Sequence, residues 1–429
     1  MMKKTILSVS LIFLFLARAV AAVTDGAETN TAFPAADGAD EAKRSTSIIV
    51  KKRSEPVQTG GVTLGSFLFI PSITLTEYHD DNIYATETNR RSDEVTAITP
   101  NFNLKSRWSR HRLDVNAGMD LTRYADYTSE NTNDYWLGLS GRYDFSARQN
   151  VFAGLNYSRE HEDRASPDAI SGDTPTKYDD YRAHLGHSFT TGNHRTRLAY
   201  TFNRLDFKDV TSTGGVIDNN DRDRTEQAIG ARYSYKYSPV MALYVEGIVD
   251  NRQYDITPDY SGNDRNSDGY RYSAGMEYAG QTNRLKIFAG VLGRDYQSAV
   301  FNDQSAFDFG LDYVWHISAQ SRLMLQGGRS IEETTFNNSS GYLMTNASVS
   351  LQIGIQEDKN IVLNAGKSAA AYYEIDRNDD YYDYSLGYNQ QLLANLRAGI
   401  EFRRTQRNSN VAANDYIINQ IFLRVSGVM

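Results

Sequence analysis

Apolar and polar residues alternate along most of this chain, from residue 67 to residue 429. Leu137 and Leu139 share one parity, whereas Ser140 and Arg142 share the other. Successive side chains of a β-strand point to opposite faces of its sheet, so this period of two predicts strands with one apolar face. The same alternation recurs in residues 229–237, 270–278, 307–315, 396–403 and 415–429.

The breaks between these segments alternate between short and long. Short breaks lie near residues 108–110, 146–149, 190–193, 238–240, 280–283, 318–321, 356–359 and 392–394. Long, charged breaks lie between them, for example at residues 80–92, 160–176, 208–220 and 257–266. This rhythm is typical of short periplasmic turns and longer extracellular loops. It predicts an all-β fold, a transmembrane antiparallel up-and-down β-barrel of about 18 strands (16–18), whose lumen is wide enough for a channel.

A soluble β-sandwich would show similar alternation, so two further features are needed to favour a membrane barrel. Aromatic residues gather at the segment ends, as an interfacial girdle requires. The N-terminus also resembles a secretory signal, with Lys3 and Lys4 before the apolar run Ile6–Leu16 and a small-residue cleavage site at residues 19–21. We therefore expect a signal peptide over 1–22, a flexible periplasmic segment over 23–64 and the barrel over 65–429.

Composition restricts the possible functions. The net charge of −8 argues against nucleic acid as a partner, because phosphate binding needs a basic surface. The chain has no cysteine, which excludes thiol nucleophiles and cysteine-ligated metals. None of its seven histidines lies in a nucleophile-elbow or metalloprotease motif. We expect no enzyme activity, no cofactor and no metal site.

Charged residues on the polar faces are predicted to point into the lumen. The candidate selectivity residues are Arg142, Arg195, Arg197, Arg232, Lys236, Arg397 and Arg403. Such charges either pair across strands or form a ring that selects permeant molecules. Among them, Arg195, Arg197, Arg232 and Lys236 lie on adjacent predicted strands with few acids between them. We hypothesise that this cluster faces a passing anionic polymer; compensation by lumenal acids such as Glu246 or Glu277 is the alternative.

Inward aromatic residues are predicted at Trp136, Phe152, Tyr244 and Phe422. They are suited either to stacking on sugar rings or to filling space in the lumen.

The first predicted strand and the loop after it carry a distinctive motif. Its residues are Pro71, Ser72, Tyr78, Asp80, Asp81, Asn82, Ile83 and Tyr84. The motif resembles the first hairpin of an outer-membrane β-barrel porin family whose genes often accompany those for exopolysaccharide or capsule synthesis. Pro and Asx residues are ordinary turn formers, so the motif either shapes the turn or contacts a substrate or partner.

The resemblance implies a barrel that takes part in export of a surface polysaccharide across the outer membrane. Its expected partners are outer-membrane lipid, the barrel-assembly machinery, periplasmic polysaccharide-export proteins and an anionic polysaccharide. A general or solute-specific diffusion porin and a structural or adhesive outer-membrane protein remain alternatives.

Overall fold

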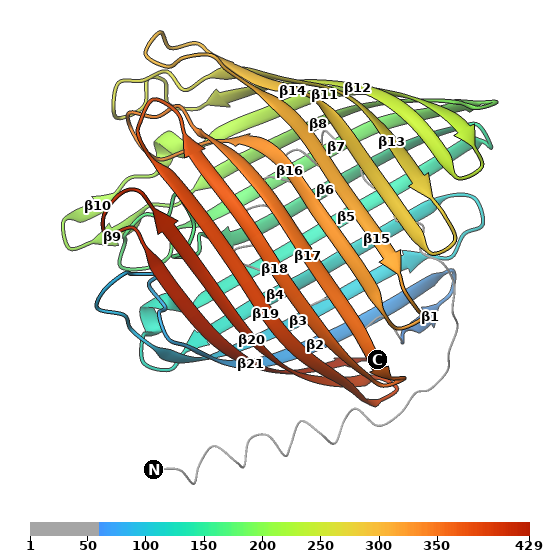
Figure 1. Ribbon diagram of the computed structural model, residues 1–429, viewed down its shortest axis with the longest axis horizontal. Coiled ribbons are helices and arrows are strands. Elements are labelled where there is room, and N and C mark those ends of the chain that lie inside the picture. The colour runs from blue at the N-terminus through green and yellow to red at the C-terminus, as the bar shows by residue number, and fades with distance from the viewer. Residues whose placement is uncertain (1–59) are drawn as a thin grey trace.

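The chain forms a closed antiparallel barrel of 18 long strands, seen in a computed structural model that describes residues 60–429 (Figure 1). The strands, in barrel order, are β2 (Phe67–Asp80), β3 (Asp93–Ser106), β4 (Arg112–Tyr124), β5 (Thr132–Ser146), β6 (Gln149–His161), β7 (Lys177–Thr191), β8 (His194–Phe207), β11 (Arg224–Ser238), β12 (Met241–Tyr254), β13 (Ser267–Ala279), β14 (Asn283–Tyr296), β15 (Gln304–His316), β16 (Arg322–Glu332), β17 (Tyr342–Gln356), β18 (Lys359–Tyr372), β19 (Asn378–Leu393), β20 (Leu396–Ser409) and β21 (Tyr416–Val428). Each strand pairs with its neighbours in sequence, and β21 pairs with β2 to close the sheet. The predicted fold class and strand number are confirmed.

Every predicted short break is a tight turn at one end of the barrel, and the long breaks lie at the other end. The long loop at residues 208–223 carries a small hairpin, β9 (Val210–Ser212) and β10 (Gly215–Ile217), which projects on the left in Figure 1. The C-terminus lies at the opposite end, beside the turns (Figure 1). Among residues 60–429, no helix has the length and apolar character needed to cross a membrane.

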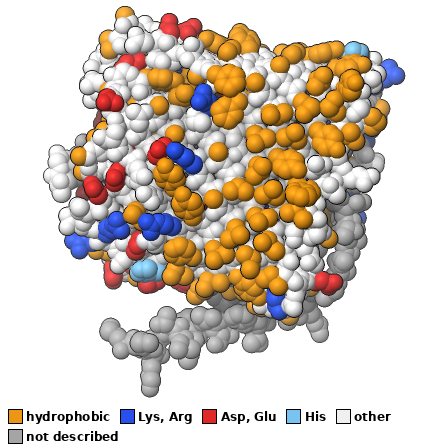
Figure 2. Space-filling model, viewed as in Figure 1, with side chains coloured by type: hydrophobic (Ala, Val, Ile, Leu, Met, Phe, Trp, Pro, Cys, Tyr) orange, Lys and Arg blue, Asp and Glu red, His pale blue; other side chains and the backbone are white. Residues whose placement is uncertain are grey.

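The two faces of the wall follow the predicted parity. Leu137 and Leu139 are exposed on the outside, whereas the neighbouring Gly138 is buried on the lumenal side. Figure 2 shows hydrophobic side chains over the strand-covered wall and charged side chains concentrated towards the loop end. An apolar outer band with polar loops at one end is the surface expected of an outer-membrane barrel.

The described chain begins with a short strand. β1 (Val62–Leu64) turns back at Gly65 and pairs with β2 (Phe67–Asp80), so these residues are ordered where we expected the end of a flexible segment. The φ of +59° at Gly65 explains the turn, because a side chain disfavours that conformation. The predicted signal peptide and most of the predicted flexible segment lie outside the described residues.

The wall departs from a regular barrel at β16. Pairing between β15 and β16 ends at Gly310 and Gly328, although β16 stays paired with β17 up to Glu332. The Arg271 guanidinium on β13 donates to the Arg329 carbonyl at 2.9 Å, and Ile331 is buried. The end of β16 beyond Gly328, from Arg329 to Glu332, therefore lies inside the barrel, against the inner face of neighbouring strands.

Candidate functional site

Two loops from opposite walls meet inside the extracellular half of the lumen. Loop 162–176 connects β6 to β7, and loop 333–341 connects β16 to β17. In barrel order, six strands separate β7 from β16 on one side and eight separate β17 from β6 on the other. Asp168 Oδ1 accepts hydrogen bonds from Thr334 Oγ1 at 2.9 Å and from the Thr335 amide at 3.3 Å. We call this connection the loop bridge; it spans the lumen and narrows it.

Loop 162–176 is fixed at its base by several other contacts. Arg164 makes a two-pronged ion pair with Glu130, with distances of 2.9 and 2.8 Å. The Tyr416 hydroxyl donates to the Ala165 carbonyl at 3.0 Å. Glu162 pairs with Arg222 of the loop that carries β9 and β10. These contacts direct the tip of the loop inward, where Asp168 meets loop 333–341.

The loop bridge contains a carboxyl group with altered acidity. Burial raises the pKa of Asp168 from 3.8 to about 6. The hydrogen bond from Thr334 and the positive charge of Arg222 lower this pKa, but by less than burial raises it, and Glu162 adds to the increase. The loop bridge is therefore sensitive to proton concentration in a mildly acidic range.

Around the loop bridge lies a cavity of about 410 Å³ whose lining includes nine carboxylates. The acidic members, which we call the acidic vestibule, are Glu160, Glu162, Asp163, Asp168, Asp218, Asp221, Asp259, Glu332 and Glu333. Three guanidinium groups, those of Arg222, Arg224 and Arg265, line the same cavity. Carboxylates therefore outnumber guanidinium groups in the lining of this cavity.

The periplasmic ends of the strands carry the opposite charge. Their inward-facing cations, which we call the basic collar, are Lys105, Arg112, Arg142, Arg195, Arg197, Lys236, Lys286, Arg322 and Arg397. Fewer acids face the lumen in this part, namely Asp114, Asp144, Glu246, Glu277, Asp312 and Glu401. Charge along the lumen therefore changes from basic at the periplasmic end to acidic at the extracellular end.

The hypothesised cation cluster forms only in part. β8 and β11 are neighbours, and Arg197 lies opposite Arg232 while Arg195 lies opposite Ser234. Arg232, however, is buried and bonds Glu246 at 2.6 Å and Glu277 at 2.8 Å. Its charge is compensated because the next strands bring these two acids beside it, a proximity that depends on register. Arg195 and Lys236 are exposed to the lumen.

The other predicted selectivity residues have different environments. Arg142 pairs with Asp144 at 3.1 Å. Arg403 is buried, with Asp383 at 3.6 Å and Glu401 at 3.9 Å. Paired guanidinium groups contribute less net charge to the lumen than Arg195 and Lys236.

The predicted inward aromatic residues pack against arginines of the wall. The Arg232 guanidinium lies 4.2 Å from the centre of the Tyr244 ring, and that of Arg197 lies 5.0 Å from the Phe152 ring. Tyr244 and Phe422 are buried. These contacts favour a space-filling role for Tyr244 over stacking on a sugar.

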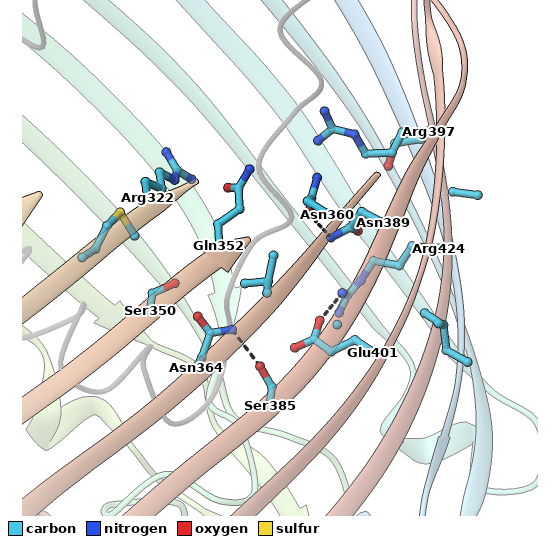
Figure 3. A pocket seen from close by; sticks show the side chains of 17 residues that line it. Arg322, Ser350, Gln352, Asn360, Asn364, Ser385, Asn389, Arg397, Glu401 and Arg424 are labelled. Carbon is cyan, nitrogen blue, oxygen red and sulfur yellow. Dashed lines mark hydrogen bonds and ion pairs between the residues drawn. The ribbon is translucent and has the colours of Figure 1, made fainter. Parts of the chain in front are cut away.

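A second cavity, of about 190 Å³, lies on the inner wall near the periplasmic ends of β16 to β21 (Figure 3). Polar side chains dominate its surface: Ser350, Gln352, Asn360, Asn364, Ser385, Asn389 and Ser426, with Arg322, Arg397, Arg424 and Glu401. Its guanidinium groups outnumber its one carboxylate, in contrast to the acidic vestibule.

The first-hairpin motif closes the barrel at its extracellular rim. Asp81 accepts two hydrogen bonds from Asn419, each 2.7 Å long, and Asp80 accepts one from Gln420 at 2.7 Å. Asn82 is fully buried and its amide donates to the carbonyl of Ile417 at 3.0 Å. All three contacts join the first loop to β21.

The remaining motif residues pack near the same seam. Tyr78 packs on Phe422 of β21, with ring centres 4.8 Å apart. The carbonyl of Pro71 accepts from the amide of Met429, just beyond the last β2–β21 pair at Ser72.

Rim residues of the motif face inward. Ile83 is buried, and Tyr84 contacts Tyr127 edge-on at 5.7 Å. The contacts of the motif support the turn-shaping alternative.

The sequence pattern did not predict the loop bridge or the polar cavity. Asp168 lies in a charged loop without periodicity, and its partner Thr334 is 166 residues away. The one available signal was the adjacent pair Gly327–Gly328, which interrupts a strand pattern where β16 leaves β15.

Comparisons with solved structures show distant likeness. OccAB4 of Acinetobacter baumannii is 10% identical, with a TM-score of 0.46 over 87% of this chain and 100% of that one. OccK3 (OpdO) of Pseudomonas aeruginosa is 13% identical, with a TM-score of 0.43 over 84% of this chain and 95% of that one. The ferric enterobactin receptor PfeA of Pseudomonas aeruginosa is 7% identical, with a TM-score of 0.47 over 87% and 81% of the two chains.

No curated protein matches the sequence. A family model does match: the family described as "Putative beta-barrel porin 2" covers residues 55–427. Because this match extends over most of the chain and includes every barrel strand, the protein belongs to that family of outer-membrane β-barrel porins.

Proposed function

We propose that this outer-membrane channel exports an anionic surface polysaccharide from the periplasm. The observation that carries the proposal is the change of charge along the lumen, from the basic collar to the acidic vestibule. An anionic chain is attracted to the periplasmic mouth, because cationic side chains of the collar such as Arg195 and Lys236 are exposed to the interior there.

The acidic vestibule supports outward release. A polyanion that has passed the loop bridge meets the carboxylates of the vestibule, which repel it. Repulsion in a confined space opposes rebinding, so a chain extended from the periplasmic side leaves towards the cell exterior. Conduction requires binding that is strong enough for entry and weak enough for exit, and two oppositely charged zones in series meet that requirement.

The expected partners follow from the position of the collar. A polymer must be delivered to the periplasmic mouth by periplasmic and inner-membrane export proteins, because the barrel has no energy source of its own. The barrel-assembly machinery is the expected partner during insertion, with β21 as the terminal strand.

Charge reversal of the collar tests the proposal. We expect the double variant Arg195→Glu/Lys236→Glu to insert normally, to shift the ion selectivity of the channel towards cations and to lower surface polysaccharide. Both side chains face the lumen and neither forms an ion pair with another residue of the described chain, so their replacement leaves no buried acid without a partner. Selectivity is measured as a reversal potential in planar bilayers, and polysaccharide is measured on cells that depend on the variant.

A matched control changes the same charge elsewhere. Arg90 and Arg91 are exposed in the first extracellular loop, so Arg90→Glu/Arg91→Glu should leave both readouts unchanged. If the collar variant alters selectivity but polysaccharide stays at the wild-type level, the export proposal is wrong.

The second candidate function is a diffusion channel for small cations. The carboxylates of the acidic vestibule favour it, because they attract cations. That candidate predicts free passage of cationic solutes and no effect of gene deletion on surface polysaccharide. The two functions therefore differ in one observable, the polysaccharide level of a deletion strain.

A further inference from the structure

The polar cavity near the periplasmic mouth has the chemistry of a saccharide site. In-facing residues of adjacent strands lie side by side there: Asn360 opposite Asn389, and Asn364 opposite both Ser350 and Ser385. Figure 3 shows these side chains directed into one space, with Arg322 and Arg397 towards one side of it. No aromatic residue is among its lining residues, so the surface is a layer of amides and hydroxyls.

The internal hydrogen bonds of this layer leave capacity for a ligand. Asn389 Nδ2 donates to Asn360 Oδ1 at 3.2 Å, and Asn364 Nδ2 donates to Ser385 Oγ at 2.8 Å. A carboxamide has two N–H donors and an oxygen with two lone pairs, so the bond between Asn360 and Asn389 does not saturate either of these two amides. Vicinal sugar hydroxyls, which both donate and accept, match such a surface.

The arginines of the cavity differ in whether a carboxylate neutralises their positive charge. Glu401 pairs with Arg424, which removes most of the net charge of that pair. Arg397 forms no ion pair with any residue in the described range, and it is half-buried beside the amide layer. A planar guanidinium in this position suits a carboxylate, which it can bind with two parallel hydrogen bonds.

A glycine on the neighbouring strand fixes the position of one of these amides. The side chain of Asn389 packs over Gly399, where an added Cβ would lie 2.5 Å from it, and both residues line the cavity. The absence of a side chain at Gly399 thus lets Asn389 take this place on the inner wall.

From this arrangement we infer that the inner wall of β17 to β21 holds an entry subsite for an acidic saccharide, with its carboxylate at Arg397 and its hydroxyls on the amides of Asn360 and Asn389. The inference rests on the proposed export function for its biological meaning, but saccharide binding is measurable without it. Single-site affinity should be weak, because a chain that moves through must also leave.

Current block in planar bilayers tests the subsite with the purified full-length protein. The probes are an oligogalacturonate, a maltooligosaccharide of equal length as the neutral comparison, and inorganic phosphate as the comparison for charge alone. We expect oligogalacturonate to block the channel at lower concentration than either comparison. Arg397→Gln should weaken the oligogalacturonate block about tenfold and leave the maltooligosaccharide block unchanged, because it removes only the carboxylate contact. Asn389→Leu should weaken the block by both saccharides.

Arg195→Gln is the comparison for general attraction, because it removes the same charge from the basic collar at a distance from this wall. It should change ion selectivity and weaken the oligogalacturonate block less than Arg397→Gln does, since only Arg397 contacts the carboxylate. Equal weakening by Arg397→Gln and Arg195→Gln, or equal block by oligogalacturonate and phosphate, would show general electrostatic attraction and overturn the subsite.

Heat-modifiable migration on gels confirms that each variant is folded. If the block behaves as expected but a gene deletion leaves surface polysaccharide unchanged, the subsite stands and the export function fails. If a gene deletion lowers surface polysaccharide but the block does not behave as expected, the export function stands and the subsite is rejected.

Discussion

Breaking the loop bridge should open the channel. Asp168→Ala removes the acceptor of two hydrogen bonds, from Thr334 Oγ1 and from the Thr335 amide. At about 1 to 1.5 kcal/mol for each bond, the bridged conformation loses about 2–3 kcal/mol relative to an open one. This corresponds to roughly a 30- to 150-fold fall in the ratio of closed to open channels. Single-channel conductance in planar bilayers should therefore be higher, while the base contacts of the loop keep the protein folded.

The pKa of Asp168 gives the same prediction a pH dependence. In the bridged state the pKa is about 6, above the ordinary 3.8, so bridging takes up a proton. The bridged state is stabilised as the pH falls through 6, and this gain is complete below the ordinary value of 3.8. The charged and titratable groups that act on Asp168 or are acted on by it are Glu162, Arg222, Tyr342 and Tyr372.

Three variants separate the possible causes. Wild-type conductance should fall between pH 7.5 and pH 4.5, whereas Asp168→Asn should give low conductance at both values, because its neutral amide oxygen still accepts. Thr334→Val should open the channel in part, whereas Thr335→Val should have no effect, since Thr335 contributes only its backbone amide. Wild-type conductance in Asp168→Ala, or an unchanged pH response in Asp168→Asn, would refute the role of the loop bridge.

Three further predictions concern the barrel itself. A cysteine at Val216, which is 68% exposed in β10, should react with an impermeant thiol reagent on intact cells. A cysteine at Gln281, in a periplasmic turn, should not react. The reverse pattern would show that the barrel has the opposite orientation in the membrane. Leu139→Arg should destabilise the barrel by about 2–4 kcal/mol because it faces lipid, whereas Ser140→Arg faces the lumen and should be tolerated, as measured by folding into lipid vesicles. Asn82→Ala should lower the temperature of the gel-mobility shift, because it removes the hydrogen bond from Asn82 to the Ile417 carbonyl of β21 and the bonds to Thr86 that shape the first loop. An unchanged temperature would show that the seam does not depend on them.

The barrel could be predicted because its signal is local. Whether Leu139 or Ser140 faces lipid follows from parity within one strand, and the turns add the rhythm that separates the two ends of the barrel. The inward direction of Arg232 follows in the same way. The neutralisation of the Arg232 charge could not be predicted from parity, because Glu246 and Glu277 become its neighbours only through the register of two further strands.

The loop bridge could not be predicted from a local sequence pattern. Loops have no periodic pattern, and a contact between Asp168 and Thr334 depends on how two hairpins on opposite walls turn inward. β16 can turn inward because Gly327 and Gly328 lie where its pairing with β15 ends. In a membrane barrel, leaving the wall also removes backbone hydrogen bonds, which is costly in lipid. The Arg329 guanidinium offsets part of this cost by donating to the Phe307 carbonyl at the free edge of β15.

This departure from the wall connects the fold to the charge pattern. Because β16 ends inside the barrel, Glu332 and Glu333 lie in the lumen as part of the acidic vestibule instead of at its rim. Glu333 bonds the Tyr254 hydroxyl at 2.5 Å and pairs with Arg252, so the inward segment is held by polar contacts with β12. The same displacement carries loop 333–341 to the tip of loop 162–176. One local break in strand pairing therefore produces both the narrowing of the lumen and two of the nine carboxylates of the acidic vestibule, and a variant that restored β15–β16 pairing should lose both together.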